Sequence, residues 1–312
     1  MNITAYSLGL PRVDNIEELS YKINLSEHTL HKVLKTVNLQ YKTIHIPKKS
    51  GSIREVHSPS AVLKAIQAWI LRNILDPILV DPAATAFVKN TNIKDNVKRH
   101  NGNRFFLCMD IEDFFPSIGQ NKVYQFFYGL GYNSHMSLVF SKFCTYYDFL
   151  PQGAVTSPSL SNLINIKLDR RIFGYCSSKN IVYSRYADDF TFSCNNPHKL
   201  IKAKYMLEKI IEDEGYELNE KKTRILRPGN TRKITGLIVA EDGRIGIGRK
   251  KKRLIRANIY NLYNKNLSQD EYKKLENHIE GWFSYLYSVD QVAYHQLKNY
   301  QSQVKLASVH IF

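Results

Sequence analysis

The sequence predicts an α+β fold made of two or three packed subdomains. Its 312 residues exceed the usual size of one hydrophobic core, and segments with strand-like alternation stand beside segments with helical periodicity. Hydrophobic residues make up 43% and charged residues 23% of the chain. That composition is typical of a globular protein and excludes a disordered or fibrous one.

The chain is strongly basic. Lys and Arg number 44 against 28 Asp and Glu, a formal net charge of +16. Such an excess favours a polyanionic partner, nucleic acid first and an anionic membrane surface second. No run of about 18 apolar residues suits a membrane-spanning helix, and the first ten residues lack a secretory pattern. We therefore expect a cytoplasmic protein with no membrane partner.

The cysteines and histidines indicate no transition-metal site. The four cysteines lie more than 15 residues apart, without a C-x-x-C pair, and the ten histidines form no H-E-x-x-H arrangement. Free cysteine is among the most buried residue types. We predict reduced core thiols at Cys108, Cys144, Cys176 and Cys194.

The N-terminal part predicts helix, hairpin and helix in turn. A helix is expected at residues 25–40 behind a cap at Ser26. Residues 41–60 alternate around Lys48-Lys49-Ser50-Gly51, which predicts a β-hairpin with a basic tip. Apolar residues then recur every three or four positions from Ser60 to Leu79, which predicts an amphipathic helix.

The rest of the chain also alternates between predicted strands and helices. Residues 104–115 form an apolar run that ends in acids, which predicts a buried strand delivering carboxylates at its C-terminal end. A helix is predicted at residues 157–173 and a tight hairpin at residues 181–194. Residues 231–265 contain ten Lys or Arg against two acids. Two helices, at residues 270–288 and 291–306, complete a compact C-terminal subdomain.

Three aspartates carry the chemical signal. Asp188 and Asp189 sit inside an otherwise apolar hairpin, where burial of ionised carboxylates is costly unless a cation compensates. Taken alone, the pair also fits a solvated turn. Asp110 ends a different strand, and several carboxylates converging on one point suit Mg²⁺, which binds through a few carboxylates, waters and substrate phosphates.

Three motifs, in order along the chain, resemble those of reverse transcriptases. Tyr186-Ala187-Asp188-Asp189 resembles the metal-binding motif of that family, and the Asp-Ile-Glu-Asp-Phe-Phe segment at residues 110–115 resembles its first acidic motif. Between them, Leu150-Pro151-Gln152-Gly153 with Ser157-Pro158 resembles the loop that positions template and nucleotide.

The resemblance implies a right-hand polymerase architecture. It places a helical lead-in at residues 1–40 and fingers at residues 41–104, with part of residues 120–150. A palm of antiparallel sheet and helices occupies residues 105–240, and a basic helical thumb that binds RNA occupies residues 241–312.

The resemblance also implies two Mg²⁺ ions and an in-line nucleotidyl transfer that needs no protein nucleophile. The ions would be held by Asp110, Asp188, Asp189 and the backbone carbonyl of Ile111. Lys222 matches a catalytic lysine that lies near the leaving pyrophosphate, with Lys221 as the alternative.

Nucleotide-binding residues are implied in the same way. Lys48, Lys49 and Arg54 resemble the fingers contacts to the incoming triphosphate, with a solvated hairpin as the alternative. Phe115 aligns with an aromatic that excludes a 2′-hydroxyl, with a plain core role as the alternative. Gln152 and Gly153 belong to the positioning loop.

The basic segment is expected to grip nucleic-acid phosphates, although a solvated helix face is the usual explanation of a charge run. The RNA-binding residues expected there are Arg249, Lys250, Lys251, Lys252, Arg253 and Arg256.

The closest resemblance is to bacterial retron reverse transcriptases. Residues 96–100 resemble the N-A-x-x-H element, with Val97 where alanine is usual, and Ile234-Thr235-Gly236 resembles the V-T-G element. Membership would imply copying of a cognate structured non-coding RNA into single-stranded DNA from a guanosine 2′-hydroxyl. The branched RNA-DNA product is called msDNA. It would also imply dNTP substrates, a role in anti-phage defence and a separate effector protein.

Two rivals remain open at this point. One is another bacterial reverse transcriptase, such as a group II intron type. The other is a non-catalytic RNA-binding scaffold that kept a polymerase fold, against which the three intact aspartates argue.

Overall fold

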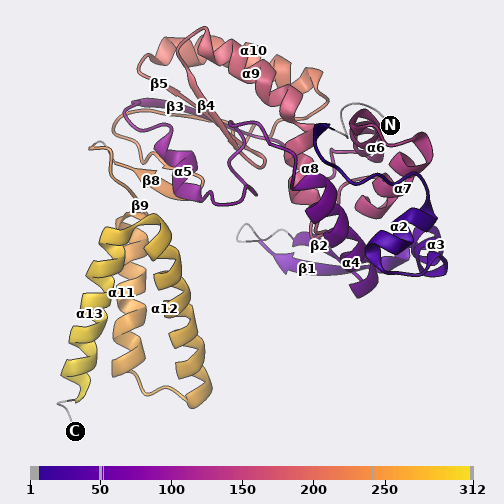
Figure 1. Cartoon of the computed structure of the whole chain (residues 1–312). Coiled ribbons are helices and arrows are strands. Elements are labelled where there is room, and N and C mark those ends of the chain that lie inside the picture. The colour runs from indigo at the N-terminus through magenta and orange to yellow at the C-terminus, as the bar shows by residue number, and fades with distance from the viewer. Residues whose placement is uncertain (1–6, 49–50, 52, 241, 310–312) are drawn as a thin grey trace.

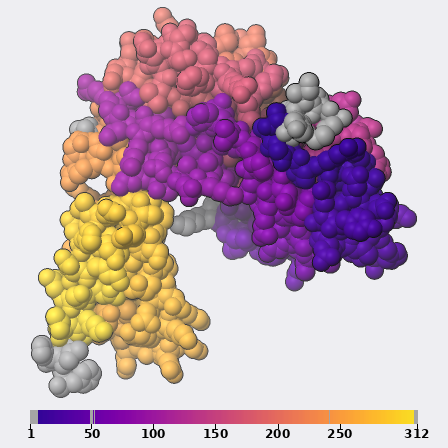
Figure 2. All heavy atoms as spheres, viewed as in Figure 1, coloured from indigo at the N-terminus to yellow at the C-terminus, as the bar shows by residue number. Residues whose placement is uncertain are grey.

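The computed structural model describes residues 7–48, 51, 53–240 and 242–309. Along the chain it comprises an N-terminal helical part with a hairpin, a central antiparallel sheet with helices, and a C-terminal three-helix bundle (Figure 1). The space-filling view shows the bundle and the N-terminal part on either side of a hollow, joined by the central part (Figure 2). The molecule is therefore open on the side of this hollow.

The N-terminal part forms around short capped helices. These are α2 (Ile16–Ile23) and α3 (Glu27–Lys35), followed by a 3₁₀ turn, η1 (Val37–Gln40). The predicted cap is confirmed, since the Ser26 side chain accepts a hydrogen bond from the Thr29 N–H. The predicted hairpin is confirmed as β1 (Tyr41–Pro47) and β2 (Ile53–Pro59), which pair antiparallel.

The helix predicted from Ser60 to Leu79 is shorter than expected. It comprises α4 (Ala61–Ile70) and a π-helical turn, η2 (Leu71–Leu75). Pro77 has no N–H with which to continue the helical ladder, so the pattern ends there although apolar residues follow. Two further helices, α6 (Gln120–Leu130) and α7 (Ser134–Cys144), pack against each other, and α7 also contacts α4.

The central sheet has four antiparallel strands in the order β4-β5-β3-β6. They are β3 (Phe105–Asp110), β4 (Val182–Tyr186), β5 (Asp189–Cys194) and β6 (Arg224–Leu226). Figure 1 shows α9 (Ile166–Ser177) and α10 (Pro197–Asp213) over one face. The helix predicted at residues 157–173 is two helices, α8 (Ser157–Ile164) and α9, because buried Asn165 leaves helical geometry between them.

The C-terminal part begins with a small antiparallel sheet of β7 (Lys233–Ile234), β8 (Leu237–Val239) and β9 (Ile245–Gly246). The bundle follows as α11 (Gly248–Asn264), α12 (Gln269–Val289) and α13 (Gln291–Val309), which confirms the two predicted C-terminal helices. The short helix α5 (Ile93–Lys98) contacts β4, β8 and α12.

Two hydrophobic cores share strand β3. Leu107 and Met109 belong to a large core that runs from the N-terminal helices to α10. Phe106 and Cys108, on the opposite face of the strand, belong to a second core with the small sheet and the bundle. All four cysteines are free and buried, as predicted. Within the described residues, no helix is both long and apolar enough to span a bilayer.

Candidate active site

The fold brings the three predicted aspartates to one end of the central sheet. Asp110 ends β3 and Asp189 begins β5, and the two residues face each other in the antiparallel register. The Ile111 N–H donates a hydrogen bond of 3.1 Å to the Asp188 carbonyl, which ties the two acidic segments together. Acids far apart in the sequence therefore lie together at one end of the sheet.

The turn that presents Asp188 rests on a buried ion pair. Ala187 adopts a left-handed conformation with φ of 57°, which is uncommon outside glycine. The fully buried Arg185 guanidinium donates 3.2 Å to the Ala187 carbonyl, and binds both carboxylate oxygens of fully buried Asp169 at 2.8 and 2.6 Å. A bidentate pair is the strongest and most directional ionic contact available to Arg. It fixes the turn from within the core.

The electrostatics of the aspartates favour a bound cation. Burial, and then repulsion from Asp110, raise the pKa of Asp188. Burial, repulsion from Asp188 and Asp110, and a hydrogen bond to Asp110 raise the pKa of Asp189 to about 7. Both shifts report excess negative charge in a desolvated place, which a divalent ion would relieve.

Lys222 lies against this cluster. Its Nζ is 2.6 Å from Asp110 Oδ1, and Asp110 itself is buried. Burial opposes the charge on Lys222, but the hydrogen bond and attraction to the aspartates outweigh it and raise the pKa of the lysine. The predicted lysine therefore partly neutralises the acids. Both Lys222 and the alternative, Lys221, are exposed, so it is the contact with Asp110 that favours Lys222.

The donor set fits Mg²⁺. Three carboxylates and the adjacent Ile111 backbone supply only hard oxygen ligands. Among the residues that the structure describes, no group of three His, Cys, Asp or Glu side chains is arranged to hold a metal ion by itself. The aspartates still suit Mg²⁺, because this ion keeps several waters and takes the rest of its shell from substrate phosphates.

The raised pKa of Asp189 predicts a pH effect on stability. The native carboxyl keeps its proton up to about pH 7, whereas an unfolded Asp loses it near pH 4. The stabilisation is therefore complete below about pH 4 and is lost as pH rises through 7. Urea unfolding in EDTA should show this fall. Asp189→Asn should flatten the curve, and an unchanged curve in that variant would contradict the assignment.

The hairpin β1–β2 reaches toward the acids. The positive charge of Arg54, an exposed residue of β2, is close enough to lower the pKa of Asp188, although burial dominates that shift. Lys48 is exposed, and its carbonyl accepts from the Gly51 N–H at 3.0 Å. Lys49 lies outside the described residues.

The loop at Pro151-Gln152-Gly153 packs directly on this hairpin. The His57 N–H donates to the Gln152 carbonyl at 2.6 Å. Gly153 has φ of 118°, and a Cβ placed there would lie 2.7 Å from the His57 carbonyl oxygen. Only glycine allows this close approach, so the loop and hairpin form one surface.

Gly153→Ala is expected to destabilise the protein by about 1–3 kcal/mol, because the backbone conformation is strained for alanine and the His57 carbonyl cannot yield cheaply. Urea denaturation measures the change. The matched control is Gly174→Ala in α9, where a Cβ meets nothing within 4 Å and the better helix former should stabilise. Equal stabilities of the two variants would contradict the proposed close contact.

Phe115 follows the strand that ends at Asp110 and lies next to aromatic neighbours. Its ring centroid is 5.4 Å from that of Phe114 and 6.2 Å from that of Phe87. Phe114 is buried, whereas Phe115 is half-buried. A partly accessible ring beside the catalytic strand can meet a ligand, which a plain core residue cannot.

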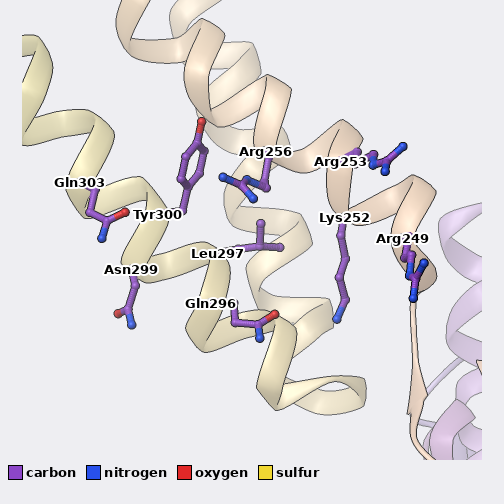
Figure 3. Close-up of a pocket in the computed structure, with 9 residues that line it drawn as sticks. All are labelled: Arg249, Lys252, Arg253, Arg256, Gln296, Leu297, Asn299, Tyr300 and Gln303. Atoms are coloured by element: carbon purple, nitrogen blue, oxygen red, sulfur yellow. The ribbon is translucent and has the colours of Figure 1, made fainter. Parts of the chain in front are cut away.

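The basic segment forms helix α11. Four of its cations line a groove of about 590 Å³ between α11 and α13, and Figure 3 shows them opposite a row of amide side chains and Tyr300. Arg256 stacks on Tyr300 with its guanidinium 4.3 Å from the ring centroid. The cations are Arg249, Lys252, Arg253 and Arg256. Lys251 instead lies over Trp282, and Lys250 is exposed.

Comparison with known proteins identifies the family. Residues 46–287 match the family described as reverse transcriptase (RNA-dependent DNA polymerase). Over 301 residues the chain is 41% identical to the retron Ec86 reverse transcriptase of Escherichia coli, covering 96% of this chain and 92% of that protein. The chain belongs to the retron reverse transcriptases. This retron reverse transcriptase is accordingly an RNA-directed DNA polymerase.

Other relatives agree with this assignment. The retron Ec73 reverse transcriptase of Escherichia coli is 31% identical over 283 residues, covering 83% of this chain and 87% of that protein. The telomerase of Candida albicans, solved with a TWJ fragment of telomeric RNA, superposes with a TM-score of 0.50 at 13% identity. That likeness covers 86% of this chain and 60% of the telomerase chain. The predicted α+β, right-hand polymerase fold is confirmed.

The two elements that resemble retron marks touch in this retron reverse transcriptase. Asn96 Nδ2 is 3.3 Å from Thr235 Oγ1, while Asn96 Oδ1 accepts from Ser184 in β4. His100 bonds Ser184 and Ser193, and its burial lowers its pKa to about 3. The imidazole is therefore neutral and structural.

The buried Arg185–Asp169 pair was missed from sequence. The signal was available, since Arg185 occupies an otherwise apolar strand next to the acidic turn. A lone arginine in a strand has many possible partners, and Asp169 gives no sign of burial in its own helix.

Proposed function

We propose that this retron reverse transcriptase copies its cognate structured non-coding RNA into single-stranded DNA. Synthesis starts from a guanosine 2′-hydroxyl of that RNA, so the product is a branched RNA-DNA, msDNA. The observation that carries the proposal is the meeting of Asp110, Asp188 and Asp189 at one end of the central sheet. Family membership supports the retron-specific part.

The aspartates hold the metal in this proposal. Asp110, Asp188, Asp189 and the Ile111 carbonyl would hold two Mg²⁺ ions, and bound metal would supply activation of the attacking hydroxyl and charge stabilisation of the leaving pyrophosphate. The chain itself orients the reactants. The Arg185–Asp169 pair keeps the Asp188 turn in place, so little reorganisation is required during the reaction.

Lys222 has two successive tasks. Before substrate binds, its ammonium neutralises Asp110 at 2.6 Å. With a metal ion held by that carboxylate, the flexible, half-exposed Lys222 side chain would be free to reach the pyrophosphate. A lysine ammonium is protonated at neutral pH, so Nζ can donate a proton to the leaving group.

The hairpin and positioning loop hold the incoming dNTP. Arg54 and Lys48, with Lys49, bind the triphosphate, and Gln152 and Gly153 shape the surface on which the nucleotide lies. We also propose the division into fingers at residues 41–104 with part of 120–150, palm at residues 105–240 and thumb at residues 241–312.

Phe115→Ala is expected to relax sugar selection. A half-buried ring next to the catalytic strand can close the space that a 2′-hydroxyl would occupy. The ratio of dNTP to rNTP incorporation should fall by roughly tenfold or more, since a lost steric contact is worth about 1–3 kcal/mol. Primer extension with each substrate measures it. Phe87→Ala, whose exposed ring is the neighbour of Phe115, is the control, and unchanged selection in Phe115→Ala would refute the role.

The basic groove of the bundle holds RNA. Cations of α11 face amides and Tyr300 of α13, a combination suited to backbone phosphates on one side and bases on the other (Figure 3). We propose that all six predicted basic residues contribute, with Arg249, Lys252, Arg253 and Arg256 in the groove. Arg253→Gln should reduce the dependence of log affinity on log salt by about one unit.

The deciding experiment expresses the chain with its flanking genomic segment and analyses extracted nucleic acid. A branched RNA-DNA species that is present in the wild type and absent in Asp188→Asn supports the proposal. Extension of a generic primer on RNA without any branched product would favour another reverse transcriptase class. A lack of extension with Mg²⁺ would favour a non-catalytic RNA scaffold.

We further propose a role in anti-phage defence together with a separate effector protein, on the strength of family membership. Cells that carry the whole locus should form fewer phage plaques than cells that carry Asp188→Asn. Equal plaque numbers would refute this part alone.

A further inference from the structure

A second polar pocket lies at the opposite end of β3 from the catalytic aspartates. It measures about 430 Å³ and is lined by the loop that enters β3 and by the β8–β9 connection. Arg104 lines it, and six residue steps of about 3.3 Å separate Arg104 from Asp110 along the strand. The pocket is thus roughly 20 Å from the reaction, outside the site described above.

Arg232 is a buried cation in the wall of this pocket. The side chain is only 6% exposed, and its Nη2 has no hydrogen-bond partner. Arginine stays protonated in proteins, and a buried, unpaired charge is expensive. Among the described residues, no carboxylate forms an ion pair with it. Within the part of the chain that the structure describes, the pocket therefore presents a buried guanidinium whose Nη2 is unsatisfied.

The other lining groups favour an anion. Arg104 is exposed and adds a second guanidinium, while Asn101 and Asn103 add amide groups, of which Asn103 Nδ2 also donates to Ser193 Oγ at 2.8 Å. Among the lining residues that the structure describes, Asp242 is the one acid, and it is already bound by Arg244 at 2.6 Å. Gly243 has φ of 80°, and a Cβ there would lie 2.9 Å from Asn101 Oδ1, so the glycine keeps the pocket wall close.

We propose that this pocket binds a backbone phosphate of the RNA, at a contact separate from both the catalytic site and the α11–α13 groove. Two guanidinium groups with amide donors match a phosphodiester, which accepts several charge-assisted hydrogen bonds. The inference rests on the proposed binding of a structured RNA. Such an RNA would be anchored at the end of β3 away from the aspartates, while its template strand reaches them.

Thermal unfolding without RNA tests the unpaired charge first. Arg232→Met removes the cation and keeps the volume, so its Tm should equal or exceed that of the wild type. Inorganic phosphate, compared with chloride at equal ionic strength, should raise the Tm of the wild type more than that of Arg232→Met. A clearly lower Tm of ligand-free Arg232→Met would overturn the proposal. Glu241 lies outside the described residues. If Glu241→Gln lowers the Tm of the ligand-free protein as much as Arg232→Met does, Glu241 is an internal partner of Arg232 and the proposal fails.

RNA binding is the second test, with the transcript of the flanking genomic segment as the probe. Arg104→Gln and Arg232→Met should each weaken binding about tenfold and lower the salt slope by about one. Arg170→Gln, an exposed arginine on α9, is the matched control and should change neither. Unchanged affinity in both pocket variants would overturn the proposal.

Primer extension on a short generic template separates this inference from the proposed function. It should be unaffected in the pocket variants, because the template is too short to reach them. Absence of a branched product from the wild type would refute the retron function. The increase in Tm caused by phosphate would still test whether the pocket binds an anion.

Discussion

Replacing Asp188 by asparagine is expected to abolish DNA synthesis while leaving the fold intact. The change removes one of the three carboxylates that share the sheet end with Asp110 and Asp189. Metal stabilisation of a phosphoryl-transfer transition state is worth several kcal/mol, so the rate should fall about a thousandfold or more. Single-turnover primer extension with Mg²⁺ measures it.

The stability of Asp188→Asn provides the sharper check. Burial and repulsion from Asp110 raise the pKa of Asp188 in the metal-free protein, so the neutral amide should leave the free energy of unfolding in EDTA unchanged or higher. Glu112→Gln, an exposed neighbour that we place outside the site, should retain activity. An Asp188→Asn enzyme that is folded and active would refute the assignment of the catalytic acids.

Asp169→Asn is expected to lower the free energy of unfolding by about 3–5 kcal/mol, the cost of leaving a buried charge without its partner. Asp169 is fully buried, binds Arg185 with both oxygens and accepts from the Tyr183 hydroxyl at 2.7 Å. The control is Asp213→Asn, which disrupts the exposed Arg171–Asp213 pair and should cost at most about 1 kcal/mol. Chemical denaturation compares the two.

The double variant Asp169→Leu with Arg185→Met separates stability from positioning. Apolar replacement of a whole buried pair is often neutral or stabilising, so the fold should recover. The Ala187 carbonyl still loses its 3.2 Å donor, so the maximal rate should stay low while dNTP affinity changes little. A double variant with wild-type rate would show that the ion pair serves only the fold.

The secondary-structure elements that depend on local sequence pattern could be predicted from the sequence. The hairpins, the Ser26 cap, the C-terminal helices and the strand ending at Asp110 follow from periodicity and capping chemistry, and the structure confirms them. Resemblance pointed to Lys222 and to the positioning loop. Lys222 contacts Asp110, and the loop packs on the hairpin β1–β2.

The rest depends on which polar side chains are buried and on the hydrogen bonds that they make. The break at Asn165 arises because a buried amide folds back on the Ser161 carbonyl, which apolar spacing does not reveal. The unpaired Arg232 looks like any other basic residue in a basic stretch, and only its burial distinguishes it. Such features require the packed molecule.

Strand β3 contributes alternate side chains to two different hydrophobic cores. Phe106 and Cys108 pack with the small sheet and bundle, while Leu107 and Met109 pack with the central core. The C-terminal third is therefore no detachable module, since its removal would expose one face of the strand that ends in Asp110. Chimeras that exchange this part between relatives should fold only when positions 106 and 108 are exchanged with it.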